Sequence, residues 1–174
     1  MKKRLILLLT ISIIFINTFA QQSQQLKFMG KSMDCSISEM VNHLSTKGCK
    51  IINKTDNSII MTGTFLGFLD CNFYLLEDHH ILWGCGIILP DYYNKSLVKF
   101  ITDYRYIIFQ YTQKYGSPQI SKSDLEGESN CRFFTEKGTI DVTIKSNKSF
   151  YNISILYINN IAKNEILKIQ QDEL

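Results

Sequence analysis

The chain has 174 residues, of which 45% are hydrophobic and 12% are aromatic, and it carries 19 basic against 16 acidic residues. That is an ordinary size for one domain with a substantial core. The first 20 residues hold three of the basic residues and none of the acidic ones, so residues 21–174 have no net charge. Because the rest of the chain also lacks a basic stripe, a nucleic-acid partner is not predicted.

The N-terminal 20 residues have the pattern of a secretory signal. A basic start, Lys2 to Arg4, precedes an apolar run from Leu5 to Ile16, and a small residue, Ala20, ends the segment. The apolar run is shorter than the roughly 18 residues of a membrane-spanning helix. We therefore expect a cleaved signal at 1–20, a flexible lead-in at 21–25 and a periplasmic or secreted domain at 26–174, with no stable membrane span after cleavage.

A capping box predicts where the first helix begins. Residues 36–39 read SISE, the S-x-x-E pattern, and apolar residues then recur at helical spacing up to Gly48. The helix is expected over Ile37 to Lys47, after a short extended piece around Leu26 to Met29. Strands are then predicted near Lys50 to Asn53 and Ile59 to Phe65.

Residues 59–90 are rich in aromatic and β-branched residues and predict an antiparallel meander. Its central hairpin is expected to pair Leu69–Leu76 with Ile81–Leu89. A continuous apolar face requires Cys71, Phe73 and Leu75 to share a face with Ile81, Trp83, Cys85 and Ile87, because the alternative register brings Gly84 and Gly86 to that face. This predicts an odd-numbered loop centred on Asp78, with Phe73 opposite Trp83 and Cys71 opposite Cys85.

The second half of the chain repeats this order of elements. Asn94 is a candidate cap for a helix at Lys95–Tyr115, which Gly116 and Pro118 end. Its predicted apolar face consists of Leu97, Phe100, Ile101, Tyr104, Ile108, Tyr111 and Tyr115. A polar loop at Ser121–Asn130 is followed by strands near Cys131–Thr135, Thr139–Ile144 and Phe150–Tyr157, and a short helix at Ile161–Gln170. The predicted class is α+β, with tandem helix-then-meander units at 26–90 and 91–160 and helices on one face of an antiparallel sheet.

Several residues at the turns and helix ends resemble those of a known group of proteins. Phe28-Met29-Gly30, Lys47-Gly48, Gly63-Thr64-Phe65 and Lys114 to Pro118 resemble uncharacterised secreted proteins of Gram-negative gut bacteria, in which the first helix follows a Gly-x-Pro-hydrophobic-Asp-Gly turn; Ser32 and Cys35 replace its proline and second glycine here. The repeat is also similar in topology to β-lactamase-inhibitor-like folds, which implies a binding module. Because the resemblance is bacterial, the terminal QDEL and the Asn-x-Ser/Thr sequons are interpreted as coincidental.

Candidate chemistry in the sequence is sparse. Five cysteines occur without a CxxC spacing, and Cys71–Cys85 is the one disulfide that the predicted register suggests. His79-His80 is the only cluster of metal-ligand types, but neighbouring residues on a turn point apart and His43 has no spacing relation to them. No hydrolase, zinc-protease or phosphate-loop motif is present, so no catalytic residue, metal or cofactor is predicted.

Six tyrosines lie on or near the second predicted helix, and Tyr92, Tyr93 and Tyr106 fall off its apolar face. Exposed tyrosines suit contact with a protein or glycan. The first functional hypothesis is therefore an exported, non-catalytic module that binds an envelope or secreted protein or a glycan through its sheet or this helix. The alternative is a thiol- or metal-dependent enzyme that uses Cys71 or Cys85 with His79 or His80.

Overall fold

The computed structural model describes residues 25–90, 97–122, 128–146 and 151–172, and it is an α+β structure as the sequence predicts. A two-stranded ribbon comes first, then a helix, a run of strands, a second helix, more strands and a last helix. The elements in order are β1 (Lys27–Phe28), β2 (Lys31–Ser32), α2 (Ile37–Thr46), β3 (Lys50–Lys54), β4 (Ser58–Phe65), β5 (Phe68–Asp78), β6 (Ile81–Ile88), α3 (Leu97–Tyr115), β7 (Gln119–Lys122), β8 (Glu128–Phe134), β9 (Gly138–Ser146), β10 (Tyr151–Asn159) and α4 (Asn160–Asp172).

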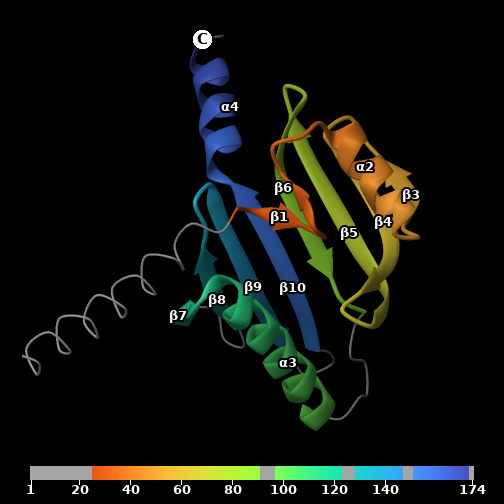
Figure 1. The fold of residues 1–174 in the computed structure, drawn as a ribbon, viewed down its shortest axis with the longest axis vertical. Helices are drawn as coiled ribbons and strands as arrows, with labels where there is room; N and C mark the ends of the chain where they lie inside the picture. Colours follow the sequence, from red (N-terminus) through yellow and green to blue (C-terminus); the bar gives the residue numbers. More distant parts are fainter. Residues whose placement is uncertain (1–24, 91–96, 123–127, 147–150, 173–174) are drawn as a thin grey trace, which may run out of the picture.

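Eight strands form one antiparallel sheet in the order β3-β4-β5-β6-β10-β9-β8-β7. Strands β3 to β6 and strands β7 to β10 are each neighbours in sequence order, and β6 pairs with β10 at the centre (Figure 1). The predicted loop at Ser121–Asn130 is too long, because β7 extends to Lys122 and β8 begins at Glu128. The sequence of β7 gives little indication of a strand, because a four-residue edge strand with one apolar side chain, Ile120, has little alternation.

The side chains of one sheet face make the core. Cross-strand partners place a row of buried residues straight across the central strands of the sheet: Met61, Phe73, Ile87, Ile155, Val142 and Cys131. A second buried row runs beside it through Ile59, Leu75, Cys85, Tyr157, Ile140 and Phe133. Apolar residues two apart on each strand therefore bury one continuous surface.

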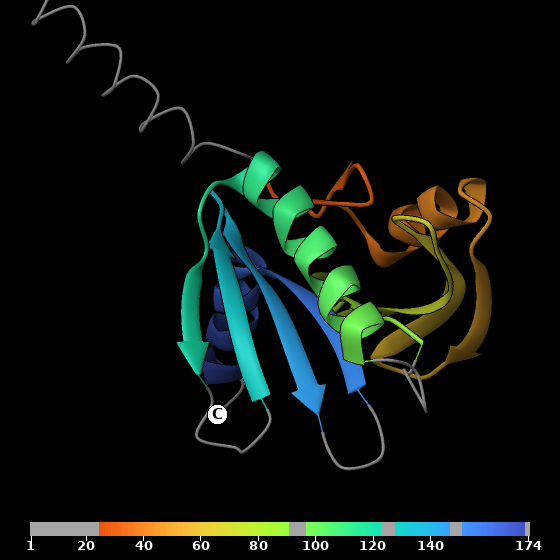
Figure 2. The same ribbon diagram turned by 90° about the horizontal axis from the view of Figure 1, so that it is seen from below.

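Three pieces of chain cover this face. Helix α2 buries Met40 and Leu44 over the β3–β6 half, while α3 lies across the β8–β10 half (Figures 1 and 2). The ribbon β1–β2 lies between them. Its Phe28 is fully buried, with its ring 5.0 Å from that of Tyr157 and 6.2 Å from that of Phe73 in edge-on contacts.

Both helices begin or end largely as the sequence predicts. The backbone N–H of Glu39 donates to the Ser36 hydroxyl, the Ser36 N–H donates to the Glu39 carboxylate at 2.9 Å, and Gly48 follows with φ of 84°. The predicted apolar face of the second helix is partly wrong, because Leu97 and Ile101 are exposed and Ile107 is buried instead. The start of this helix at Lys95 and its cap Asn94 lie outside the described residues.

The β5–β6 hairpin corrects the predicted register. Asp78 pairs with Ile81 across a two-residue turn, and Phe73 lies opposite Ile87 rather than Trp83. A bulge in β6 leaves Trp83 without a partner, opposite the step from Leu76 to Glu77 in β5. Because of this extra residue, the side chains that face the core from Cys85 onward are the predicted ones. Cys85 and Ile87 face the core, while Gly84 and Gly86 do not. Leu82, 2% exposed, is buried where Trp83 was expected.

Helix α4 continues from β10 beyond the end of the sheet (Figure 1) and packs against the tip of this hairpin. Gln170 donates to the Asp78 carboxylate at 3.0 Å, and Ala162 and Ile166 are buried. The Asn159 side chain accepts hydrogen bonds from the backbone N–H groups of Ile161 and Ala162 and so caps the helix. In the described ranges, the helices are too short or too polar to cross a membrane.

Candidate functional site

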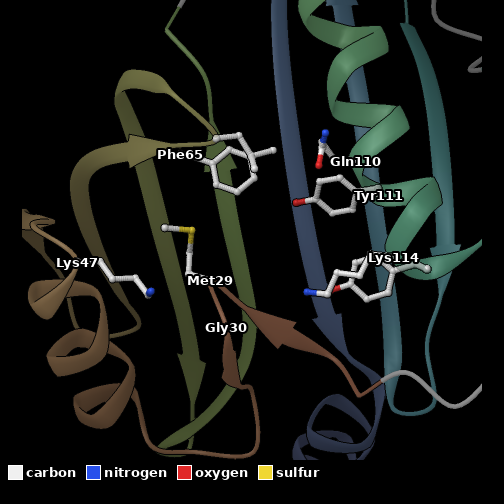
Figure 3. Close-up of a pocket in the computed structure, with 9 residues that line it drawn as sticks. Met29, Gly30, Lys47, Phe65, Gln110, Tyr111 and Lys114 are labelled. Carbon is white, nitrogen blue, oxygen red and sulfur yellow. The ribbon is translucent and has the colours of Figure 1, made fainter.

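A pocket of about 350 Å³ opens between the α2 side and the α3 side of the covered sheet face. Turns β1–β2 and β4–β5, the C-cap residue of α2 and the C-terminal end of α3 surround it (Figure 3). Its volume falls within the range of about 300–1,000 Å³ that small-ligand sites occupy. The lining residues are Met29, Gly30, Lys47, Phe65, Leu66, Gln110, Tyr111, Lys114 and Tyr115.

Two tight turns bring apolar side chains to this pocket. In each turn a non-glycine residue with positive φ precedes a glycine: Met29 (51°) before Gly30 (94°), and Leu66 (48°) before Gly67 (86°). These values fit type I′ turns, in which both central residues lie in the left-handed region. Asn and Asp are favoured at the first of these positions, and a side chain such as Leu is disfavoured there. Because backbone strain of this kind clusters at ligand-binding sites, we hypothesise that Met29 and Leu66 contact a ligand in the pocket.

The first of these turns is held in place from α2. The Nε2 atom of His43 donates to the backbone carbonyl of Met29 at 3.1 Å. His43 is thus a positioning residue for the pocket wall, a role that its isolated place in the sequence gives no reason to predict.

The opposite wall is aromatic and contains an unsatisfied hydroxyl. The hydroxyl groups of Tyr111 and Tyr157 share a buried hydrogen bond, and burial raises the pKa of both phenols. Tyr115 is 6% exposed, and within the described part of the chain its hydroxyl oxygen has no hydrogen-bond partner. A buried hydroxyl without a partner costs about 1–3 kcal/mol. Tyr115 therefore offers a donor to a ligand atom at this wall.

Two lysines give the pocket a positive charge. Lys47 and Lys114 extend into the gap from opposite sides (Figure 3), and the Lys114 ammonium lies 4.9 Å from the centre of the Tyr115 ring. The lining residues include no carboxylate. The site therefore combines an apolar interior with a cationic rim.

Cys71 and Cys85, the candidate disulfide and the thiols of the alternative hypothesis, do not line this pocket and are buried in the core. Cys85 lies opposite Leu75, four residues from Cys71 along β5. Four residues of strand span about 13 Å, whereas disulfide-bonded Cα atoms lie within about 7 Å. The register that suggested a Cys71–Cys85 disulfide is therefore wrong, and both side chains are free thiols. Burial raises the pKa of the Cys71 thiol to about 11 and that of Cys85 well above its ordinary value.

His79 and His80 form the tip of the β5–β6 hairpin, with φ of 46° and 63°. His79 lies 3.7 Å from the Asp78 carboxylate, while His80 lines a different pocket with Cys35 and Asp34. Sequence reasoning did not associate Cys35 with these residues. Burial raises the pKa of the Cys35 thiol, which disfavours the thiolate that a nucleophile needs. Within the described ranges no three His, Cys, Asp or Glu side chains are arranged to hold a metal ion.

The predicted contact tyrosines are only partly described. Tyr106 is 43% exposed and its ring lies 6.5 Å from that of Phe68, so it lies between α3 and the start of β5. Tyr92 and Tyr93 lie outside the described residues. On the other sheet face, a shallow apolar groove of about 260 Å³ passes over Gly86 beside Tyr74 and Leu156.

No family model matches this chain, and neither the curated proteins nor the solved structures provide a match.

Proposed function

We propose that this protein is a non-catalytic binding module whose ligand occupies the pocket between the two turns and α3. The unpartnered hydroxyl of Tyr115 carries the proposal, because a buried polar group without a partner is retained at a cost that a bound ligand would remove. The apolar residues Met29, Phe65 and Leu66 supply the contact area that a small ligand needs.

The composition of the pocket favours binding over catalysis. Its lining has no cysteine, histidine, serine or carboxylate, the groups that most often serve as nucleophile or general base. Cys49, Cys71, Cys85 and Cys131 are buried and do not line it, and Cys35 lines a separate pocket.

The position of the pocket also supports a tandem architecture, which we propose for residues 26–90 and 91–160. Each unit would contribute one helix and four neighbouring strands, and the pocket would lie between them. Lys47 and Lys114, each close to a glycine that ends its helix, come to it from corresponding places. We further propose export after cleavage at Ala20, which N-terminal sequencing tests: the mature protein should begin at Gln21.

Isothermal titration with decan-1-ol tests the proposed site. Wild-type protein should bind this ligand saturably, and Leu66→Asn should weaken binding about tenfold through lost apolar contact. Asn tolerates positive φ, so this variant should keep its fold. Leu69→Asn is the matched control, since Leu69 is 66% exposed and does not line the pocket. Absence of saturable binding, or equal weakening by both variants, would overturn the proposal.

A further inference from the structure

We infer that the ligand of this pocket is an amphipathic anion, with an apolar body and one terminal acidic group held by Lys47, Lys114 and Tyr115. The inference rests on the proposed function and adds the charge of the ligand to it. Three independent features of the pocket support it: facing cations, a free buried donor and an apolar floor.

The two cations face the same space. The Lys47 and Lys114 side chains approach from α2 and α3, and the gap between them leads to the pocket (Figure 3). Among the described residues, neither ammonium has a carboxylate partner. Like charges that converge on one apolar space repel each other, and an anion placed between them replaces that repulsion with attraction.

Helix termini account for the presence of lysines but not for the charge of the pocket. Lys47 is the C-cap residue of α2 and Lys114 lies in the last turn of α3, where cations are favoured. The same helix ends carry partial negative charge, which would disfavour an anion. Two lysines directed into the gap offset that charge, whereas side chains directed into solvent would not do so.

The buried hydroxyl of Tyr115 adds a directional hydrogen bond to the attraction of the two lysines. The Tyr115 phenol can donate one hydrogen bond, and a charged acceptor makes a shorter and stronger bond than a neutral one. An ionised acidic group has enough acceptor sites for a phenol and two ammonium groups at once. The apolar body of the ligand would then contact Met29, Phe65, Leu66 and Tyr111.

Titration with decanoate and decan-1-ol, which differ only in the headgroup, tests the inference. Wild-type protein should bind decanoate at least tenfold more tightly than decan-1-ol, and raising the salt concentration should weaken decanoate binding alone. The double variant Lys47→Gln/Lys114→Gln should lose about tenfold for decanoate and nothing for decan-1-ol. Lys50→Gln/Lys54→Gln is the control, because these lysines lie on the exposed edge strand β3 and outside the pocket.

The outcomes separate the two proposals. Equal affinities for decanoate and decan-1-ol, or a loss shared by the control variant, would overturn the inference of an anion and leave the binding site in place. Failure of both ligands to bind would overturn both proposals. Tyr115→Phe gives a further readout, since it should reduce decanoate affinity more than decan-1-ol affinity, and an equal reduction would count against the anion.

Discussion

The Sγ atom of Cys49 lies 2.6 Å from the point that a Cβ atom would occupy on Gly63. Cys49 and Gly63 lie side by side where β3 and β4 begin and end, and Cys71 is the partner of Gly63 on the other side. The glycine leaves room for the buried cysteine beside it, so this part of the core depends on the absence of one side chain.

Gly63→Ala should therefore destabilise the protein by about 1–3 kcal/mol through overpacking. Adding Cys49→Ala should recover part of that loss, because it removes the sulfur that the new methyl group meets. Gly86→Ala is the control, since its nearest neighbour to the new atom lies 3.6 Å away. Urea unfolding measures these variants together with Cys49→Ala alone, and additive losses in the double variant would contradict the packing explanation.

Acid should weaken the contact that joins the first and second halves of the chain. Lys137 donates to the Asp34 carboxylate at 2.6 Å, and this contact, aided by Asn159 and Ser32, lowers the pKa of Asp34. A carboxyl whose folded pKa lies below the unfolded value of about 3.9 contributes stability above that pH and loses it as the pH falls.

Asp34→Asn should consequently flatten the dependence of unfolding free energy on pH below about pH 4, with a loss near neutral pH of no more than about 1 kcal/mol because the pair is partly exposed. Lys137→Gln should act in the same direction. Chemical unfolding at several pH values measures the effect, and a pH profile identical to that of the wild type would show that the ion pair contributes nothing.

Sequence patterns predicted most of the elements because each depends on local chemistry. The capping box at Ser36 and the positive-φ glycine at 48 fix the ends of α2 from within the helix itself. The face of β5 and β6 was also predictable, since Cys71, Phe73 and Leu75 need an apolar partner surface. The register was not, because one bulged residue, Trp83, changes the pairing without changing which side chains are apolar.

The pocket could not be predicted in the same way. Met29-Gly30 and Leu66-Gly67 are recognisable as candidate two-residue turns, and Lys47 and Lys114 as residues at helix ends. No local pattern indicates that these four places meet, since that depends on β6 pairing with β10 and on the ribbon lying between the helices. Nor does any spacing show that the hydroxyl of Tyr115 lacks a partner.

Thiol labelling should proceed in an order set by burial. Burial raises the pKa of Cys71 to about 11 and that of Cys85 well above its ordinary value, so neither should react with iodoacetamide near neutral pH unless the protein unfolds. Cys35, which is partly exposed, should react first. Mass spectrometry of timed samples measures the order. Rapid labelling of Cys71 or Cys85 in the folded protein would contradict this order and favour the alternative hypothesis of a thiol enzyme.

Removal of the Tyr115 hydroxyl should have opposite effects on stability and binding. Tyr115→Phe eliminates an unpartnered buried group and should stabilise the free protein by about 1 kcal/mol. The same change should weaken ligand binding, because the donor is lost. Thermal unfolding and titration measure the two effects. A destabilised variant would mean that the hydroxyl is satisfied in solution.

The central claim is that a ligand occupies the pocket between the two turns and α3, and an amide chemical-shift map with decanoate tests it most directly. Titration into ¹⁵N-labelled protein should shift saturably the amides of Met29, Gly30, Lys47, Leu66 and Lys114. Shifts confined to the uncovered sheet face around Tyr74 and Leu156, or no saturable shifts at all, would contradict the account.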